Sequence, residues 1–289
     1  MACRNQLLTG FTVLIASTII GCSGGGEAGP AVGSPEWLWD AAAANNGISD
    51  FEKIEEHLGK LVGSENPWQD RARVWRFVLL NGLAAGYAEL GDAYRDGAKV
   101  NEGRAAQFMS SQQQYRRDAR RHTIALVEGL GAWRKQIGSA STISIDFPLP
   151  AGSGKQSPVL ASVSEGVYPN ERQAGSVKSE TLQRSILLSA ASAAGAGEEI
   201  AKARSAFENT PIEVAAAPFF LAAAQALVDR SEIFGRDNLM EAAKEIFLLD
   251  MAAAFAAAAA EGEDEELKEQ AEQLLKEIDD SKIPPKRRR

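Results

Sequence analysis

Apolar residues recur in steps of three and four from Pro35 to about Ile137, the spacing that places them on one face of a helix. One long run ends near Tyr94, and its seam contains Trp68, Ala72, Trp75, Leu79, Leu83, Tyr87, Leu90 and Tyr94. A second run begins near Asn101, and its seam contains Phe108, Gln112, Tyr115, Ala119, His122, Leu126, Leu130, Trp133 and Ile137. Because a short connection joins them, the two runs predict an antiparallel helical hairpin.

Shorter helices are expected before this hairpin, because residues typical of helix caps occur in that part of the chain. Ser49 and Glu52 have the spacing of a capping box, in which two side chains satisfy the first backbone N–H groups of a helix. Asn66 followed by Pro67 predicts the start of the first long helix, since proline is favoured at the first helical position.

The helical pattern stops over residues 138–176. Within this insert, Thr142 to Phe147 alternate between polar and apolar positions, which predicts a strand. Pro148 and Pro150 are expected to end it, since proline has no N–H group to donate to a sheet. The insert therefore separates an N-terminal helical region, 35–137, from a C-terminal one.

Helical spacing returns from about Val177, and the C-terminal helical region is expected to cover 177–280. The run Thr210-Pro211-Ile212-Glu213 has a cap, a proline and an acid in the order typical of a helix start. Pro218 is then expected to kink or divide that helix. Two further helices are predicted at the end of the region, over 239–260 and 265–278.

These elements predict an all-α fold, a bundle or a stack of helical hairpins with one irregular insert near 138–176. Leu83, Ala84, Tyr87 and Gly91 are spaced as in the first helix of a tetratricopeptide repeat, which this short run resembles. The likeness ends at Asp96, where that repeat has a small residue, and no period of about 34 residues recurs. A tetratricopeptide-like stack is thus the alternative architecture.

The first residues follow another pattern. Arg4 precedes an apolar run, Leu7–Ile20, which is shorter than the roughly 20 residues that a membrane-spanning helix needs. The run ends in Ile19-Ile20-Gly21-Cys22, and the whole segment resembles the signal peptide and lipobox of bacterial lipoproteins. An ordinary signal peptide or an uncleaved anchor is the alternative.

The lipoprotein resemblance implies that residues 1–21 are removed and that Cys22 carries the acyl chains, palmitate among them, that anchor the mature chain. It implies a location in the bacterial cell envelope, and Ser23 favours the periplasmic face of the outer membrane if the cell is Gram-negative. Residues 22–34 are rich in Gly and Ser and are expected to be a flexible tether. At the other end, 281–289 is expected to be a basic disordered tail.

The charge and the cysteine content of the chain exclude some classes of function. The chain of 289 residues carries 31 basic and 39 acidic side chains, a net charge of −8. An acidic chain is a poor generic partner for nucleic acid, whose phosphates demand Lys and Arg. The two cysteines are Cys3 and Cys22, so a lipidated mature chain has no disulfide and no cysteine zinc site.

Four arginines form the clearest candidate binding residues, and they flank a histidine on the second long seam. They are Arg116, Arg117, Arg120 and Arg121, beside His122. Residues 101–140 are net basic and 241–280 strongly acidic, so one interpretation is a solvated face with ion pairs between these segments. The other is a site for an anion or an acidic partner. His122 is either a core histidine or a pH-sensitive ligand contact.

Signatures of catalysis are missing from the sequence. His57 and His122 are the only histidines, and the chain has neither an HExxH metal motif nor a GxSxG nucleophile elbow. Gly152 to Ser157 lacks the spacing of a phosphate-binding loop. We therefore expect no metal, no cofactor and no enzymatic activity.

The combined expectation is a lipid-anchored cell-envelope protein that acts as a protein-interaction or scaffold module, with the membrane and an envelope protein as partners. The alternative is a periplasmic small-ligand-binding lipoprotein, whose pocket would be lined by aromatic residues together with Arg117, Arg121 and His122.

Overall fold

The computed structural model describes residues 29–134, 137, 141–152, 154–197, 199–207, 211–234 and 239–282. The predicted signal peptide, Cys22, most of the tether and the tail beyond Lys282 lie outside the described residues. Within them the fold is all-α, as predicted, with one small two-stranded sheet.

The described residues form helices of very different length and two short strands. In order they are α1 (Pro35–Gly47), α2 (Phe51–Val62), α3 (Gln69–Val100), the 3₁₀ turn η1 (Glu102–Arg104), α4 (Ala105–Arg134), β1 (Thr142–Ile145), α5 (Pro158–Ser164), α6 (Glu171–Ala193), α7 (Ile200–Phe207), β2 (Ile212–Ala215), α8 (Ala216–Ser231), α9 (Leu239–Ala260) and α10 (Glu265–Lys282).

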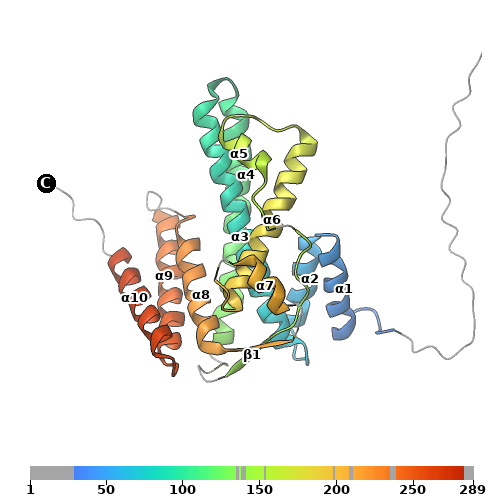
Figure 1. Cartoon of the computed structure of the whole chain (residues 1–289), viewed down its shortest axis with the longest axis vertical. Helices are drawn as coiled ribbons and strands as arrows, with labels where there is room; N and C mark the ends of the chain where they lie inside the picture. Colours follow the sequence, from blue (N-terminus) through green and yellow to red (C-terminus); the bar gives the residue numbers. More distant parts are fainter. Residues whose placement is uncertain are drawn as a thin grey trace, which may run out of the picture.

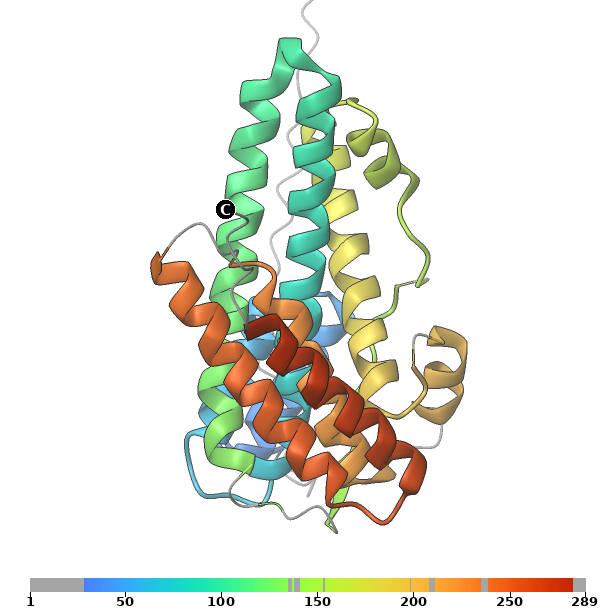
Figure 2. The same ribbon diagram turned by 90° about the vertical axis from the view of Figure 1, so that its left-hand side faces the viewer.

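The predicted antiparallel hairpin is confirmed: α3 and α4 lie side by side along most of their length (Figure 2). The predicted seam is buried where it lies on α4, except at Gln112, which is only partly covered. Ile137, the last residue of that seam, lies beyond the end of α4 at Arg134 and is also partly covered. Asn101 begins the connecting turn, and its side chain accepts a hydrogen bond from the Arg104 N–H group. Near the tip, a Cβ atom at Gly97 would lie 2.5 Å from the Phe108 ring, so glycine lets the helices approach.

Helix α6 packs against the other side of α3, and two glycines one turn apart make room for it. A Cβ atom at Gly82 would lie 2.5 Å from the Cα atom of Ile186, and one at Gly86 would lie 2.9 Å from Leu182. Backbone therefore touches backbone at this crossing, as small residues spaced by four allow.

The prediction of a helix start at residues 210–213 is wrong. Thr210 lies outside the described residues, but Ile212 to Ala215 form β2, which pairs antiparallel with β1. The register sets Ile145 opposite Ile212 and Ile143 opposite Val214. The β-branched residues fit a pleated surface, and β1 supplies backbone partners that no local signal reveals.

The predicted kink at Pro218 is also wrong. Helix α8 begins at Ala216, so Pro218 occupies its first turn, where the missing N–H group removes no helical hydrogen bond.

The irregular insert is shorter than predicted. The strand at Thr142 is confirmed, but the insert contains α5, and α6 begins at Glu171 rather than at Val177. Asn170 and Gln173 form a capping box at that start, a signal that is present in the sequence.

Two other helix starts differ by two residues or fewer. Asp50 caps α2 in place of Ser49, whose φ of 58° is left-handed. Helix α3 begins at Gln69, and Asn66 accepts a hydrogen bond from Trp68 just before it.

Aromatic packing fastens the insert to the N-terminal helices. After β1, Asp146 forms an ion pair with Arg71 of α3, whose guanidinium lies 4.6 Å and 4.3 Å from the Trp39 and Trp68 rings. The next residue, Phe147, stacks on Trp75 with ring centroids 5.6 Å apart.

The hairpin and α6 form the centre of the molecule, with α1 and α2 on one side and α8, α9 and α10 on the other (Figure 1). Phe219 of α8 joins the C-terminal helices to this centre through edge contacts with Phe77 and Trp133. Both helical regions therefore contribute to one continuous apolar core.

Candidate functional site

The arginines of α4 are divided by the helix into two groups. Arg116 and Arg120 are partly buried at the sides of the hairpin, whereas Arg117 and Arg121 are exposed. Residues four apart share a face of a helix, so this division follows directly from the spacing.

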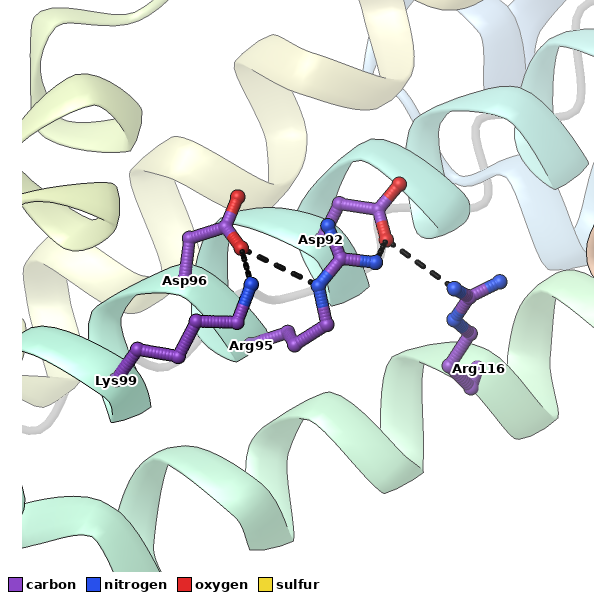
Figure 3. A network of polar contacts seen from close by, with 5 residues as sticks. All are labelled: Asp92, Arg95, Asp96, Lys99 and Arg116. Carbon is purple, nitrogen blue, oxygen red and sulfur yellow. Dashed lines mark hydrogen bonds and ion pairs between the residues drawn. The ribbon is translucent and has the colours of Figure 1, made fainter.

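Arg116 reaches across the hairpin and belongs to a network on α3 (Figure 3). Its guanidinium lies 3.2 Å from Asp92, which also accepts a hydrogen bond of 2.8 Å from Arg95. Arg95 donates to Asp96 as well, and Lys99 donates to the same carboxylate at 2.8 Å. Hydrogen bonds from Lys99 and then from Arg95 lower the pKa of Asp96. Arg116 is thus committed to an internal partner.

Arg121 borders a buried polar contact between α4 and α2. Its Nη2 atom lies 3.3 Å from Nε2 of His122. Because a guanidinium can only donate, Nε2 is the acceptor and the imidazole proton lies on Nδ1. That Nδ1 atom faces Glu55 Oε2 at 3.5 Å, and Arg76 lies 3.9 Å from the other oxygen of Glu55. The contact with His122 is the main cause that lowers the pKa of Glu55, with Arg76 and Arg121 adding to it.

His122 is a core residue, with 2% of its surface exposed. Its ring stacks on Tyr87 with centroids 5.4 Å apart and planes 4° from parallel. Burial raises the pKa of Tyr87 to about 12. Since Tyr87 and Glu55 enclose the imidazole, the structure favours the core interpretation of His122 over that of a ligand contact.

Arg117 has no hydrogen bond or ion pair among the described residues, and Arg121 makes only long ion pairs, 3.9 Å to Glu52 and 4.0 Å to Asp118. Arg116 and Arg121 form their ion pairs with residues of α3, α2 and α4 itself. A direct hydrogen bond from α4 to the acidic segment 241–280 is donated by Arg134 to the backbone oxygen of Ala254.

Beside these arginines, α4 and α9 enclose an apolar hollow of about 230 Å³. Its walls include Ile124 and Val127 of α4 and Phe247 and Leu248 of α9, with Phe234 between the helices. Ile124 and Phe247 are 38% and 55% exposed. This hollow was not predicted from the sequence, although Ile246 and Phe247 stand out as exposed apolar residues before the alanine run of α9.

Two cationic side chains lie at the edge of this hollow. Arg120 and Lys244 lie 5.9 Å and 5.7 Å from the Phe234 ring. Arg117, Arg121 and Ile124 follow one another at steps of four and three, so the exposed charges lead directly to the apolar wall. We call the hollow and this stripe of α4 the α4–α9 surface.

The part of the chain that the structure describes has no group of three or more metal-ligating side chains. His57 is packed edge-on against Trp37 at 5.6 Å. None of the described helices combines the length and the apolar character that a bilayer span requires.

No family model matches the chain, and comparison with curated proteins and with solved structures found no match either.

Proposed function

We propose that the chain is a lipid-anchored cell-envelope protein that binds another envelope protein through the α4–α9 surface. The observation that carries the proposal is the exposed apolar hollow between α4 and α9, bordered by cations. Large apolar side chains left open to solvent and rimmed by polar groups are typical of interaction sites.

The chemistry of the surface selects the partner. An amphipathic helix could place apolar side chains against Ile124 and Phe247, as helix-in-groove complexes do. Its carboxylates would then meet Arg117 and Arg121, whose charges are not neutralised at short range. Charge complementarity of this kind favours an acidic helix over a basic one and speeds association.

The anchor supports this role by concentrating the protein at the bilayer. Two or more acyl chains hold a protein stably at a membrane, where one chain gives only marginal binding. A tether of about a dozen residues would keep the helical body about 20 Å from Cys22, within reach of other envelope proteins.

The test is site-specific crosslinking in native membranes. A photoreactive residue at Phe247 should capture one acidic envelope protein, and the double change Arg117→Glu with Arg121→Glu should abolish the product without lowering the unfolding temperature. The matched control carries the photoreactive residue at Glu272, an exposed position on α10. The proposal fails if Phe247 captures nothing, or the same products as Glu272.

The alternative function, a small-ligand pocket formed with Arg117, Arg121 and His122, has less support. The imidazole is enclosed by Tyr87 and Glu55, so a ligand at this point would have to displace core packing.

A further inference from the structure

A second cavity, formed by α3, α6 and α8, has a different chemical character from the α4–α9 surface. Its volume is about 350 Å³, at the small end of the range for ligand pockets. Its charged lining residues are Glu89, Arg184, Asp229 and Arg230, and its polar lining residues include Asn81, Ser189 and Gln225. Ala85, Leu188 and Ala226 supply an apolar wall.

Two of the charged side chains that line this cavity form an ion pair with each other. Arg184 of α6 donates to both carboxylate oxygens of Glu89 on α3, at 3.1 Å and 3.2 Å. One nitrogen, Nη1, makes both contacts, and the two side chains are each 28% exposed. This pair therefore adds no net charge to the wall.

Arg230, at the end of α8, is not satisfied in this way. Its side chain is only 13% exposed, and its ion pair among the described residues is with Asp229, whose carboxylate oxygen lies 4.0 Å away. The Asp229 side chain is 49% exposed, so water screens that contact. The buried Nε of Arg230 has no hydrogen-bond acceptor within the described residues. Burial lowers the pKa of Arg230, as expected for a cation that lacks a close counter-charge.

An unsatisfied acceptor lies in the same cavity. The Asn81 side chain donates to Ser189 at 3.1 Å, but its buried Oδ1 atom has no donor among the described residues. Buried polar atoms in proteins are nearly always hydrogen-bonded. Both unmatched atoms are buried from solvent, so a ligand in the cavity meets them only after the Asn81 and Arg230 side chains turn toward it, and it must then carry the complementary groups.

We propose that this cavity binds a small carboxylic acid with a hydrogen-bond donor beside the carboxylate, an α-amino or an α-hydroxy acid. Arg230 holds the carboxylate, Asn81 Oδ1 accepts from the ammonium or hydroxyl group, and the apolar wall covers a short side chain. The site shares no lining residue with the α4–α9 surface and does not depend on its function.

The experiment is calorimetric titration of the full chain with L-valine and with L-α-hydroxyisovalerate, which differ only in the donor. Binding of either probe supports the carboxylate site, and their ratio separates the amino acid from the hydroxy acid. L-valinamide, which lacks the carboxylate, should bind at least tenfold more weakly than L-valine, since a hydrogen bond to a charged group contributes at least that factor.

Two variants keep the outcome interpretable. Arg230→Gln should weaken binding about tenfold or more, whereas Arg172→Gln, which removes an exposed arginine from α6, should leave it unchanged. If Arg230→Gln fails to fold, Ala222→Leu serves instead, because Ala222 also lines the cavity and leucine is well tolerated in helices. The proposal is overturned if neither probe binds at millimolar concentration, which would mean that water alone fills the cavity, or if binding survives both variants.

Discussion

Gly82 and Glu55 illustrate how single side chains decide the packing of the central helices. At Gly82 the absence of a Cβ atom allows α6 to touch the backbone of α3. At Glu55 a half-buried carboxylate is matched by His122, Arg76 and Arg121. Each makes a prediction that a stability measurement can check.

Replacing Gly82 by alanine should destabilise the protein by about 1–3 kcal/mol, the usual cost of forcing an extra methyl group into a packed core. The new Cβ atom would lie 2.5 Å from Ile186 Cα, so the two helices must separate. Denaturant unfolding measures the change. Gly175→Ala on α6 is the matched control, since nothing lies within 4 Å of its Cβ position, and it should stabilise by about 0.5–1 kcal/mol.

Stability should depend on pH through Glu55. Its pKa is lowered in the folded state, mainly by the contact with His122 and further by Arg76 and Arg121. This contribution to stability is therefore complete above pH 4.5, the ordinary pKa of the carboxyl group. It is lost as the pH falls through the lower pKa of the folded state. Glu55→Gln should flatten this part of the curve of unfolding free energy against pH, whereas the exposed Glu272→Gln should retain it. An unchanged slope in Glu55→Gln would contradict the assignment.

At the scale of elements, the region around residues 211–218 departs most from its local signals. Proline and an acid near Ile212 are typical of a helix start, yet pairing with β1 makes this segment a strand. The helix then begins four residues later, at Ala216. Pairing with β1, which is distant in sequence, thus delays the helix start to Ala216 and places Pro218 in the first turn of α8.

This position makes Pro218 nearly neutral. Pro218→Ala should change the free energy of unfolding by less than about 1 kcal/mol, because a proline in the first turn breaks no helical hydrogen bond. Introducing proline at Ala224, inside α8, should cost about 3 kcal/mol or more. Urea titration of both variants is the measurement, and a large gain in stability from Pro218→Ala would restore the kinked-helix interpretation.

At the scale of the whole molecule, a single apolar core joins both helical regions, and two hollows of different chemistry lie on different elements. The α4–α9 surface is apolar with exposed cations, and the cavity of α3, α6 and α8 is polar with a buried cation. We propose a macromolecular partner for the first and a small acid for the second.

The proposed anchor belongs to this scale because it sets where the molecule works. Mass spectrometry of the native protein should find an acylated N-terminal peptide that begins at Cys22, since lipoprotein processing cuts before the modified cysteine. Cys22→Ser should release the chain from the membrane fraction. Recovery of an intact Met1 to Cys22 peptide would remove the anchor from the account.

Periodicity along the chain was enough to predict the hairpin of α3 and α4, β1 and the two last helices, because it is a local property that survives in any tertiary context. The same periodicity separated Arg117 and Arg121 from His122 on the surface of α4. The tertiary structure was needed to show that Arg116 pairs with Asp92, that Ile212 joins a strand, and that Arg230 and Asn81 line one cavity. Those outcomes depend on contacts with distant parts of the chain. The local pattern of apolar and polar residues does not reveal which distant residues will come into contact.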